Sequence, residues 1–232
     1  LAATQLPAVC SAGSGTCGLS AGVTIVQSGG TTNVTEAGGT DSYTVVLNAA
    51  PSADVTVTVS PDAQVGVSAT SLTFTTATWN IPQTVTVSAV DDAIAEGAHT
   101  GTITHSASGG GYTGVSIASV TANITDNDTA GVTITQSGGT TNVTEGGATD
   151  TYTVVLTSQP ASNVTIAVSP NAQLTTSGNL TFTSANWMTA QTVTVTAVND
   201  AIAEGTHAGT ITHSASGGGY TGISIASVNA TI

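Results

Sequence analysis

The sequence predicts an all-β protein with two tandem antiparallel β-sandwiches in an elongated chain, and three observations favour this. Apolar and hydroxyl residues alternate in short runs, such as Val-Thr-Val-Thr-Val at residues 55–59, between clusters of Gly, Pro, Asn and Asp. Alternation with a period of two places one residue type on each face of a strand. No window shows the 3.6-residue period of an amphipathic helix. Finally, the sequence repeats itself once, at a spacing of a whole domain.

The repeat extends over most of the chain. Residues 21–25 return as residues 130–134, and Glu36 returns as Glu145, each 109 positions later. From Phe74 onward the spacing is 108, because one residue is missing from a loop of the second copy. Solenoid repeats are about 20 to 50 residues long, so a spacing near 109 indicates duplicated domains.

We therefore expect three parts: an N-terminal leader at 1–20, a first sandwich at 21–128 and a second sandwich at 129–232. Each sandwich contains seven or eight strand-like runs, and about 100 residues are enough for such a domain to bury its own core. The last residue, Ile232, is the copy of Ile124, so we expect the second sandwich to lack the acidic segment that closes the first, unless further chain was cleaved or left out.

The leader contains the only two cysteines, Cys10 and Cys17, in a stretch rich in Gly and Ser. An oxidising, secreted setting would favour a disulfide between them. The alternative is two unpaired thiols in a tail.

The charge composition excludes several classes of partner. The chain has 13 acidic residues, no Lys and no Arg, and a formal net charge of -13. Nothing in it neutralises phosphate, so we expect neither nucleic acid nor an anionic membrane surface as a partner. No run of about 20 apolar residues is present, so we expect no membrane span. This composition favours an extracellular, secreted protein.

The few large aromatic residues recur at equivalent positions in the two copies. We interpret them as core residues, although Trp and Tyr side chains also stack on sugars. They are Tyr43, Phe74, Trp79 and Tyr112, with the copies Tyr152, Phe182, Trp187 and Tyr220.

An acidic junction, Asp126-Asn127-Asp128, closes the first copy. Its carboxylates have no side-chain cation to pair with, because the chain contains no Lys or Arg. Such a cluster either stays in water or binds a hard metal ion through its oxygens.

Several segments together resemble the Calx-beta domain family, and the resemblance covers nearly all of residues 21–232 in two copies. It implies a seven-stranded, Ig-like sandwich with calcium held by loops at one end, and a tandem array similar to those of bacterial extracellular surface or matrix proteins. The segments of the first copy are Val34-Thr35-Glu36, Leu72–Thr75 with Trp79-Asn80, Gln83–Val87, Asp91–Gly97 and Ile124–Asp128.

The resemblance implies a set of Ca²⁺ ligands, and carboxylates suit an ion that takes about six to eight oxygen ligands. In the first copy the implied ligands are Glu36, Asp91, Asp92, Glu96, Asp126 and Asp128. The second copy keeps Glu145, Asp200 and Glu204, for which we expect weak binding or none. The alternative in both copies is a solvated cluster of loop carboxylates.

Four histidines form two equivalent pairs: His99 with His105, and His207 with His213. The spacing of six places both members of a pair on one face of a strand, which would suit a zinc or copper pair. A packing or sheet-surface role is the alternative that we favour.

We find no nucleophile–base set, zinc signature or phosphate loop, so we do not expect an enzyme. The sequence favours a structural subunit of an extracellular filament, sheath or surface layer, stiffened by Ca²⁺ and self-associating. Strand exchange with the apolar segment 1–9 as donor is one route to assembly. The alternative is the stalk or ligand-binding module of a calcium-dependent adhesin that recognises cell-surface glycans or proteins.

Overall fold

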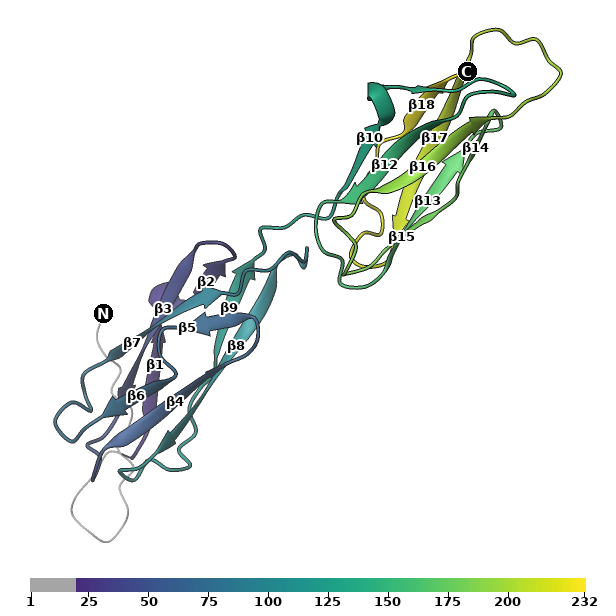
Figure 1. Ribbon diagram of the computed structural model, residues 1–232. Coiled ribbons are helices and arrows are strands. Elements are labelled where there is room, and N and C mark those ends of the chain that lie inside the picture. The colour runs from purple at the N-terminus through teal and green to yellow at the C-terminus, as the bar shows by residue number, and fades with distance from the viewer. Residues whose placement is uncertain (1–19) are drawn as a thin grey trace. The chain divides into compact units, whose positions relative to one another are not determined.

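A computed structural model describes residues 20–232, which are almost entirely β-strand, turn and loop. Figure 1 colours the chain from its N-terminus to its C-terminus. Contacts divide it into two compact units: residues up to Asp92 with Ala98–Asn127, and Ala93–Gly97 with Asp128–Ile232. The all-β class is therefore confirmed, whereas the leader and its predicted Cys10–Cys17 disulfide lie outside the described residues.

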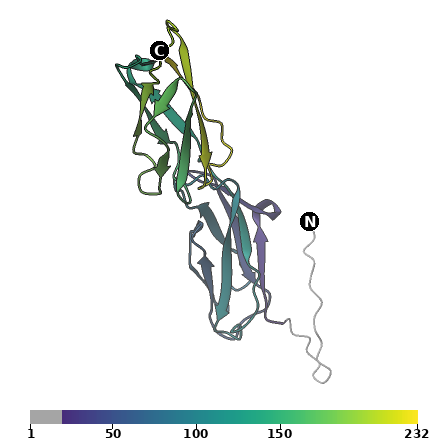
Figure 2. The same ribbon diagram turned by 90° about the vertical axis from the view of Figure 1, so that its right-hand side faces the viewer.

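The first sandwich has nine strands. They form two layers, as Figures 1 and 2 show. One sheet has the order β1-β3-β7-β5 and the other β2-β9-β8-β4-β6. The strands are β1 (Val23–Gln27), β2 (Thr32–Thr35), β3 (Thr40–Leu47), β4 (Val55–Pro61), β5 (Val65–Val67), β6 (Ser71–Phe74), β7 (Gln83–Ala89), β8 (His99–Ser108) and β9 (Val120–Thr125).

The second sandwich repeats this topology with sheets β10-β12-β16-β14 and β11-β18-β17-β13-β15. Its strands are β10 (Val132–Gln136), β11 (Thr141–Asn142), β12 (Asp150–Leu156), β13 (Val164–Pro170), β14 (Leu174–Thr176), β15 (Leu180–Phe182), β16 (Gln191–Ala197), β17 (Ala208–Ser216) and β18 (Val228–Thr231).

A glycine turn moves the chain from one sheet to the other near the start of each sandwich. In the first, the 3-10 turn η1 (Ser28–Gly30) separates β1 from β2, and Gly29 has φ 62°, a conformation that a residue with a Cβ rarely adopts. Strand β2 then pairs in parallel with β9. The predicted antiparallel sandwich is therefore confirmed with one parallel pair at this edge, and the structure has nine strands where the sequence indicated seven or eight. The turn η2 (Ser137–Gly139) and the parallel pair β11–β18 repeat the arrangement.

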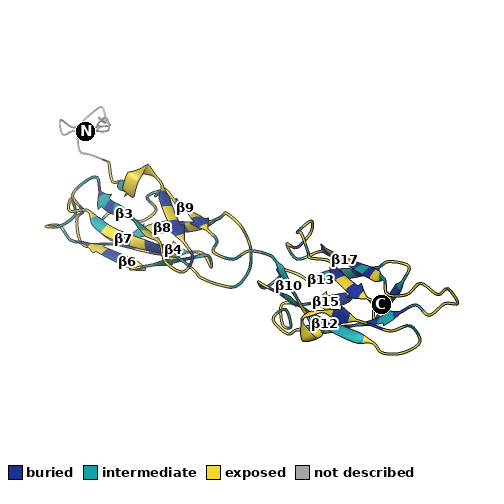
Figure 3. Cartoon of the chain, turned by 90° about the horizontal axis from the view of Figure 1, so that it is seen from above, coloured by how far each residue is buried: buried dark blue, intermediate teal, exposed yellow. Residues whose placement is uncertain are grey.

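The alternation of residue types decides which side chains form the core. In β4 the residues Val55, Val57 and Val59 are at most 1% exposed, while the residues between them face outward. Figure 3 shows the same alternation of buried and exposed positions along the strands. Burying one such side chain stabilises the fold by about 1.5–3 kcal/mol.

The aromatic residues belong to this core, as predicted. Tyr43, Phe74 and Tyr112 are at most 1% exposed, and Trp79 is partly buried against the same cluster. The Tyr112 hydroxyl donates to the Ala49 carbonyl at 2.7 Å, which satisfies its one buried polar atom. The packing interpretation of these residues is confirmed. The second sandwich has an equivalent cluster around Tyr152, Phe182, Trp187 and Tyr220.

Within the described residues, no helix has the length and apolar character needed to cross a membrane.

Candidate metal centre

The parallel pair β2–β9 gathers acidic residues at one end of the first sandwich. Thr35 lies opposite Thr125 at the carboxyl ends of these strands. The next residues, Glu36 and Asp126, therefore leave the sheet at the same end. The backbone N–H of Glu36 donates to the carbonyl of Thr125 at 3.1 Å and fixes this arrangement. His99 begins the neighbouring strand β8 at this end of the sheet.

Glu36 is the unusual member of the group, because its carboxylate is buried. The residue is 2% exposed, and neither carboxylate oxygen has a hydrogen-bond partner of normal geometry. Its Oε1 lies 3.8 Å from Nε2 of His99, which is beyond hydrogen-bond distance. A buried, ionised carboxylate without hydrogen bonds costs several kcal/mol unless a proton or another cation neutralises it.

The pKa of Glu36 also indicates that its ionised form is disfavoured in the metal-free protein. Burial is the largest cause of a raised Glu36 pKa, and the negative charges of Asp126 and Asp92 raise the pKa further. The Asn127 backbone and the His99 imidazole act in the opposite direction, and the net shift is upward. The site therefore disfavours a bare anion at Glu36 and favours a bound positive charge.

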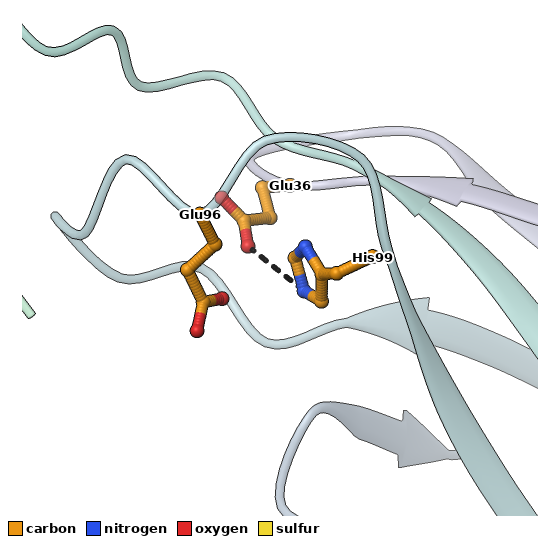
Figure 4. Close-up of side chains that lie close together, drawn as sticks. All are labelled: Glu36, Glu96 and His99. Carbon is orange, nitrogen blue, oxygen red and sulfur yellow. Dashed lines mark ion pairs between the residues drawn. The ribbon is translucent and has the colours of Figure 1, made fainter. Parts of the chain in front are cut away.

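Two groups of potential ligand atoms share Glu36. One contains Asp126 and Asp128, and the other contains Glu96 and His99; within each group the ligand atoms lie within 4.8 Å of one another. Figure 4 shows Glu36 close to Glu96 and His99, which lie three residues apart where the chain enters β8. Two oxygens bound to one Ca²⁺ at about 2.3–2.6 Å lie at most about 5 Å apart, so these separations fit a shared ion.

Two other predicted ligands stand around these groups. Asp91 accepts a hydrogen bond from the Asn127 side chain at 3.1 Å, which ties the loop after β7 to the segment after β9. Asp92 acts on Glu36 through its charge. Neither belongs to a group of converging ligand atoms, so their roles as direct ligands stay predictions.

The second sandwich has its own group, formed by Glu145, Glu204 and His207, with ligand atoms within 4.8 Å of one another. These residues line a pocket of about 300 Å³. Asp200, which the resemblance also implied, instead accepts the backbone N–H of Ile202 at 2.7 Å in a local turn. His207 belongs to this group and Asp200 does not, so the role of Asp200 as a ligand stays a prediction.

The histidines do not form the zinc or copper pair considered above. His99 and His105 lie six residues apart on one strand, about 20 Å at 3.3 Å per residue, so no single ion binds both. His105 is instead half-buried and packs against Tyr43: Tyr43 Oη lies 2.8 Å from its Nε2, and the Ala118 carbonyl lies 3.0 Å from its Nδ1.

Because a carbonyl can only accept, Nδ1 of His105 carries the hydrogen and Nε2 accepts from the tyrosine. His213 repeats this arrangement with Tyr152 at 2.7 Å and the Ala226 carbonyl at 2.9 Å. Burial lowers the pKa of both imidazoles, despite the opposite effect of the carbonyls.

Fold and site together define a tandem β-sandwich protein with an acidic, partly buried loop cluster at one end of its first sandwich. No family model matches the chain, and no curated protein matches it. Among solved structures it is similar to CBD12 from CALX1.2, with 18% identity over 82% of this chain and 79% of that one and a TM-score of 0.32.

Two further structures are similar at the same level. The calcium binding domain CBD12 of CALX1.1 has 16% identity over 83% of this chain and 80% of that one, with a TM-score of 0.34. The titin domains Z1Z2 in complex with telethonin have 14% identity over 91% of this chain and 95% of that one, with a TM-score of 0.36. A likeness of this degree concerns the fold alone.

Proposed function

We propose that the first sandwich is a non-catalytic calcium-binding module, and that Glu36 and Asp126 provide its central ligands. The observation that carries this is the buried Glu36 carboxylate, whose oxygens have no hydrogen-bond partner of normal geometry and which lies within a group of acidic side chains. In a chain without Lys or Arg, a dissolved cation is the available source of a full positive charge at neutral pH.

The donor atoms favour Ca²⁺ among the common divalent ions for the group Glu36, Asp126 and Asp128. All are carboxylate oxygens on loops, and Ca²⁺ accepts six to eight oxygens in a flexible geometry. Mg²⁺ demands a near-ideal octahedron and gives up its water reluctantly, so loops of this kind suit it less well. The resemblance of the surrounding segments to the Calx-beta family also supports Ca²⁺.

Calorimetric titration of metal-free protein with CaCl₂ tests this proposal. We expect Glu36→Gln and Asp126→Asn each to weaken binding to the first sandwich at least tenfold, because each removes a central anionic ligand. Asp54→Asn is the matched control, since it removes the same charge. Asp54 precedes β4, whose residue Thr56 pairs with Ser108, so it lies about 30 Å along β8 from the site. Equal binding by all three variants would contradict the proposal.

We extend the proposal to a structural role in an extracellular assembly. It is supported by two near-identical β-rich copies, by a charged surface made of acids alone, and by the absence of a recognisable catalytic set in the sequence. On this proposal copies of the chain self-associate, and Ca²⁺ promotes the association by neutralising part of the net charge of -13. Light scattering and electron microscopy with and without Ca²⁺ test it; monomers at high protein concentration in both conditions would reject it.

A further inference from the structure

Among residues 20–232, each sandwich contains a mixed group of two carboxylates and one imidazole. Glu145, Glu204 and His207 form it in the second, and their copies in the first are Glu36, Glu96 and His99. Oxygen ligands suit Ca²⁺, whereas an imidazole nitrogen beside carboxylates suits Zn²⁺ and its first-row neighbours. The chemistry of this group therefore differs from that of the all-oxygen group around Asp126.

The distances in the second sandwich agree with a small, four-coordinate ion. Nε2 of His207 lies 3.2 Å from Oε2 of Glu204, yet the two atoms do not have hydrogen-bond geometry. Zinc bonds of about 2.0–2.2 Å in a tetrahedron place two ligand atoms about 3.4 Å apart. In the first sandwich the separation of His99 Nε2 from Glu36 Oε1 is 3.8 Å.

The other ring nitrogen of His207 fixes the form of the imidazole. Nδ1 lies 2.9 Å from the Gly205 carbonyl, which can only accept, so Nδ1 carries the hydrogen. The lone pair of a neutral ring is then on Nε2, which is buried and has no hydrogen-bond partner. A histidine that donates one ring N–H to a carbonyl and presents the other nitrogen is the usual arrangement of a metal ligand.

The surroundings leave room for an ion and its remaining ligands. The pocket of about 300 Å³ is lined by all three residues of the group, together with apolar side chains such as Val143 and Ile202. In the first sandwich the shared carboxylate of Glu36 has a side chain that is 1% exposed, and it is directed toward His99 (Figure 4). A buried carboxylate such as that of Glu36 is stabilised by a cation bound beside it.

We propose that these two groups are binding sites for Zn²⁺ or a similar first-row divalent metal, one in each sandwich. The site in the second sandwich stands apart from the proposed calcium function. The site in the first shares Glu36 with it, so that there Zn²⁺ and Ca²⁺ compete.

Titration of metal-free protein with ZnCl₂ in a calcium-free, non-chelating buffer tests the proposal. We expect two bound ions per chain, one in His207→Gln, and none in the double variant His99→Gln/His207→Gln. Asp54→Asn is again the control and keeps both sites. Melting curves of the metal-free variants establish that each is folded. The ¹⁵N resonance of His207 Nε2 gives a second readout, because direct coordination shifts this nucleus and a distant ion does not.

The outcomes separate this proposal from the calcium proposal. His99→Gln retains the all-oxygen group, so it should lose Zn²⁺ at the first site and still bind Ca²⁺. Protein that binds Ca²⁺ but no Zn²⁺ would overturn the zinc proposal alone, leaving His207 and Glu204 as a simple ion pair. Zinc uptake that is undiminished in the double variant would also overturn it, since the exposed carboxylates would then be the ligands. Zinc binding without calcium binding would overturn the calcium proposal instead.

Discussion

Replacing Glu36 by Gln should change the stability of the first sandwich in opposite directions with and without Ca²⁺. The Glu36 pKa is raised chiefly by burial, so the folded state binds its proton more tightly than the unfolded chain does. As the pH rises above the ordinary pKa of a glutamate side chain, the metal-free folded state therefore loses stability relative to the unfolded chain, and at neutral pH this loss persists. Gln has the same shape without the charge, so the metal-free variant should melt at a higher temperature than the wild type.

With Ca²⁺ the order should reverse. A ligand at one hundred times its Kd stabilises the folded state by about 2.7 kcal/mol. For a domain of this size each kcal/mol raises Tm by roughly 4–8 °C, so the wild type should gain on the order of 10–20 °C. Glu36→Gln should gain little of this.

The assay is thermal melting followed by tryptophan fluorescence. Each sandwich has one tryptophan, so Trp187→Phe in both proteins leaves Trp79 as the reporter of the first sandwich. Asp54→Asn is the control for loss of charge. If Glu36→Gln melted below the wild type without metal and showed the full Ca²⁺-dependent rise, the reasoning on its burial would be refuted.

Three further predictions follow from the core and the turns. Burial lowers the pKa of His105 and His213, so these residues take up protons in the unfolded chain at a higher pH than in the folded state. As the pH falls below about 6.5, the free energy of unfolding should therefore decrease. Urea unfolding midpoints at pH 8 and pH 5.5 check this, and equal midpoints would contradict it. Tyr43→Phe leaves the His105 acceptor unpaired and should cost about 1–3 kcal/mol in urea unfolding, whereas an unchanged midpoint would show that the 2.8 Å contact is not a hydrogen bond. Gly110→Ala should lower the free energy of unfolding by more than Gly111→Ala does. Both residues have positive φ, but a Cβ at Gly110 would overlap the backbone carbonyl oxygen of Ala53, whereas a Cβ at Gly111 would meet nothing within 4 Å. Similar losses of stability in the two variants would refute the steric argument.

Local pattern was sufficient to predict the fold class. The alternation at Val55, Val57 and Val59 sets the buried face of a strand whatever its partner, and the repeat identified by Glu36 and Glu145 implies two similar units. The crossing at η1 was not predictable in this way. The sheet that a strand joins depends on partners far away in the sequence. Strand β2 pairs with β9, and the paired residues Thr32 and Ala122 are 90 positions apart.

In the candidate site, too, the sequence predicted the type of residue but not which residues lie together. The residue types pointed to carboxylate chemistry, and Glu36 lies near Asp126 and Asp128 in one group and near Glu96 in another. The spacing along the chain placed His99 on the same face of a strand as His105. Only the pairing of β8 with β9 shows that the His99 side chain lies beside Glu36. The sequence did contain one indication that this histidine belongs with the glutamates: Glu96 and His99 recur together in the second copy as Glu204 and His207.

The central claim is that the acidic end of the first sandwich holds a calcium ion. The most direct measurement is a crystal structure of the protein grown in millimolar CaCl₂, with anomalous diffraction recorded to identify the ion. We expect an anomalous peak with oxygens of Glu36 and Asp126 about 2.3–2.6 Å from it. Well-ordered carboxylates at that place with no ion among them would contradict it.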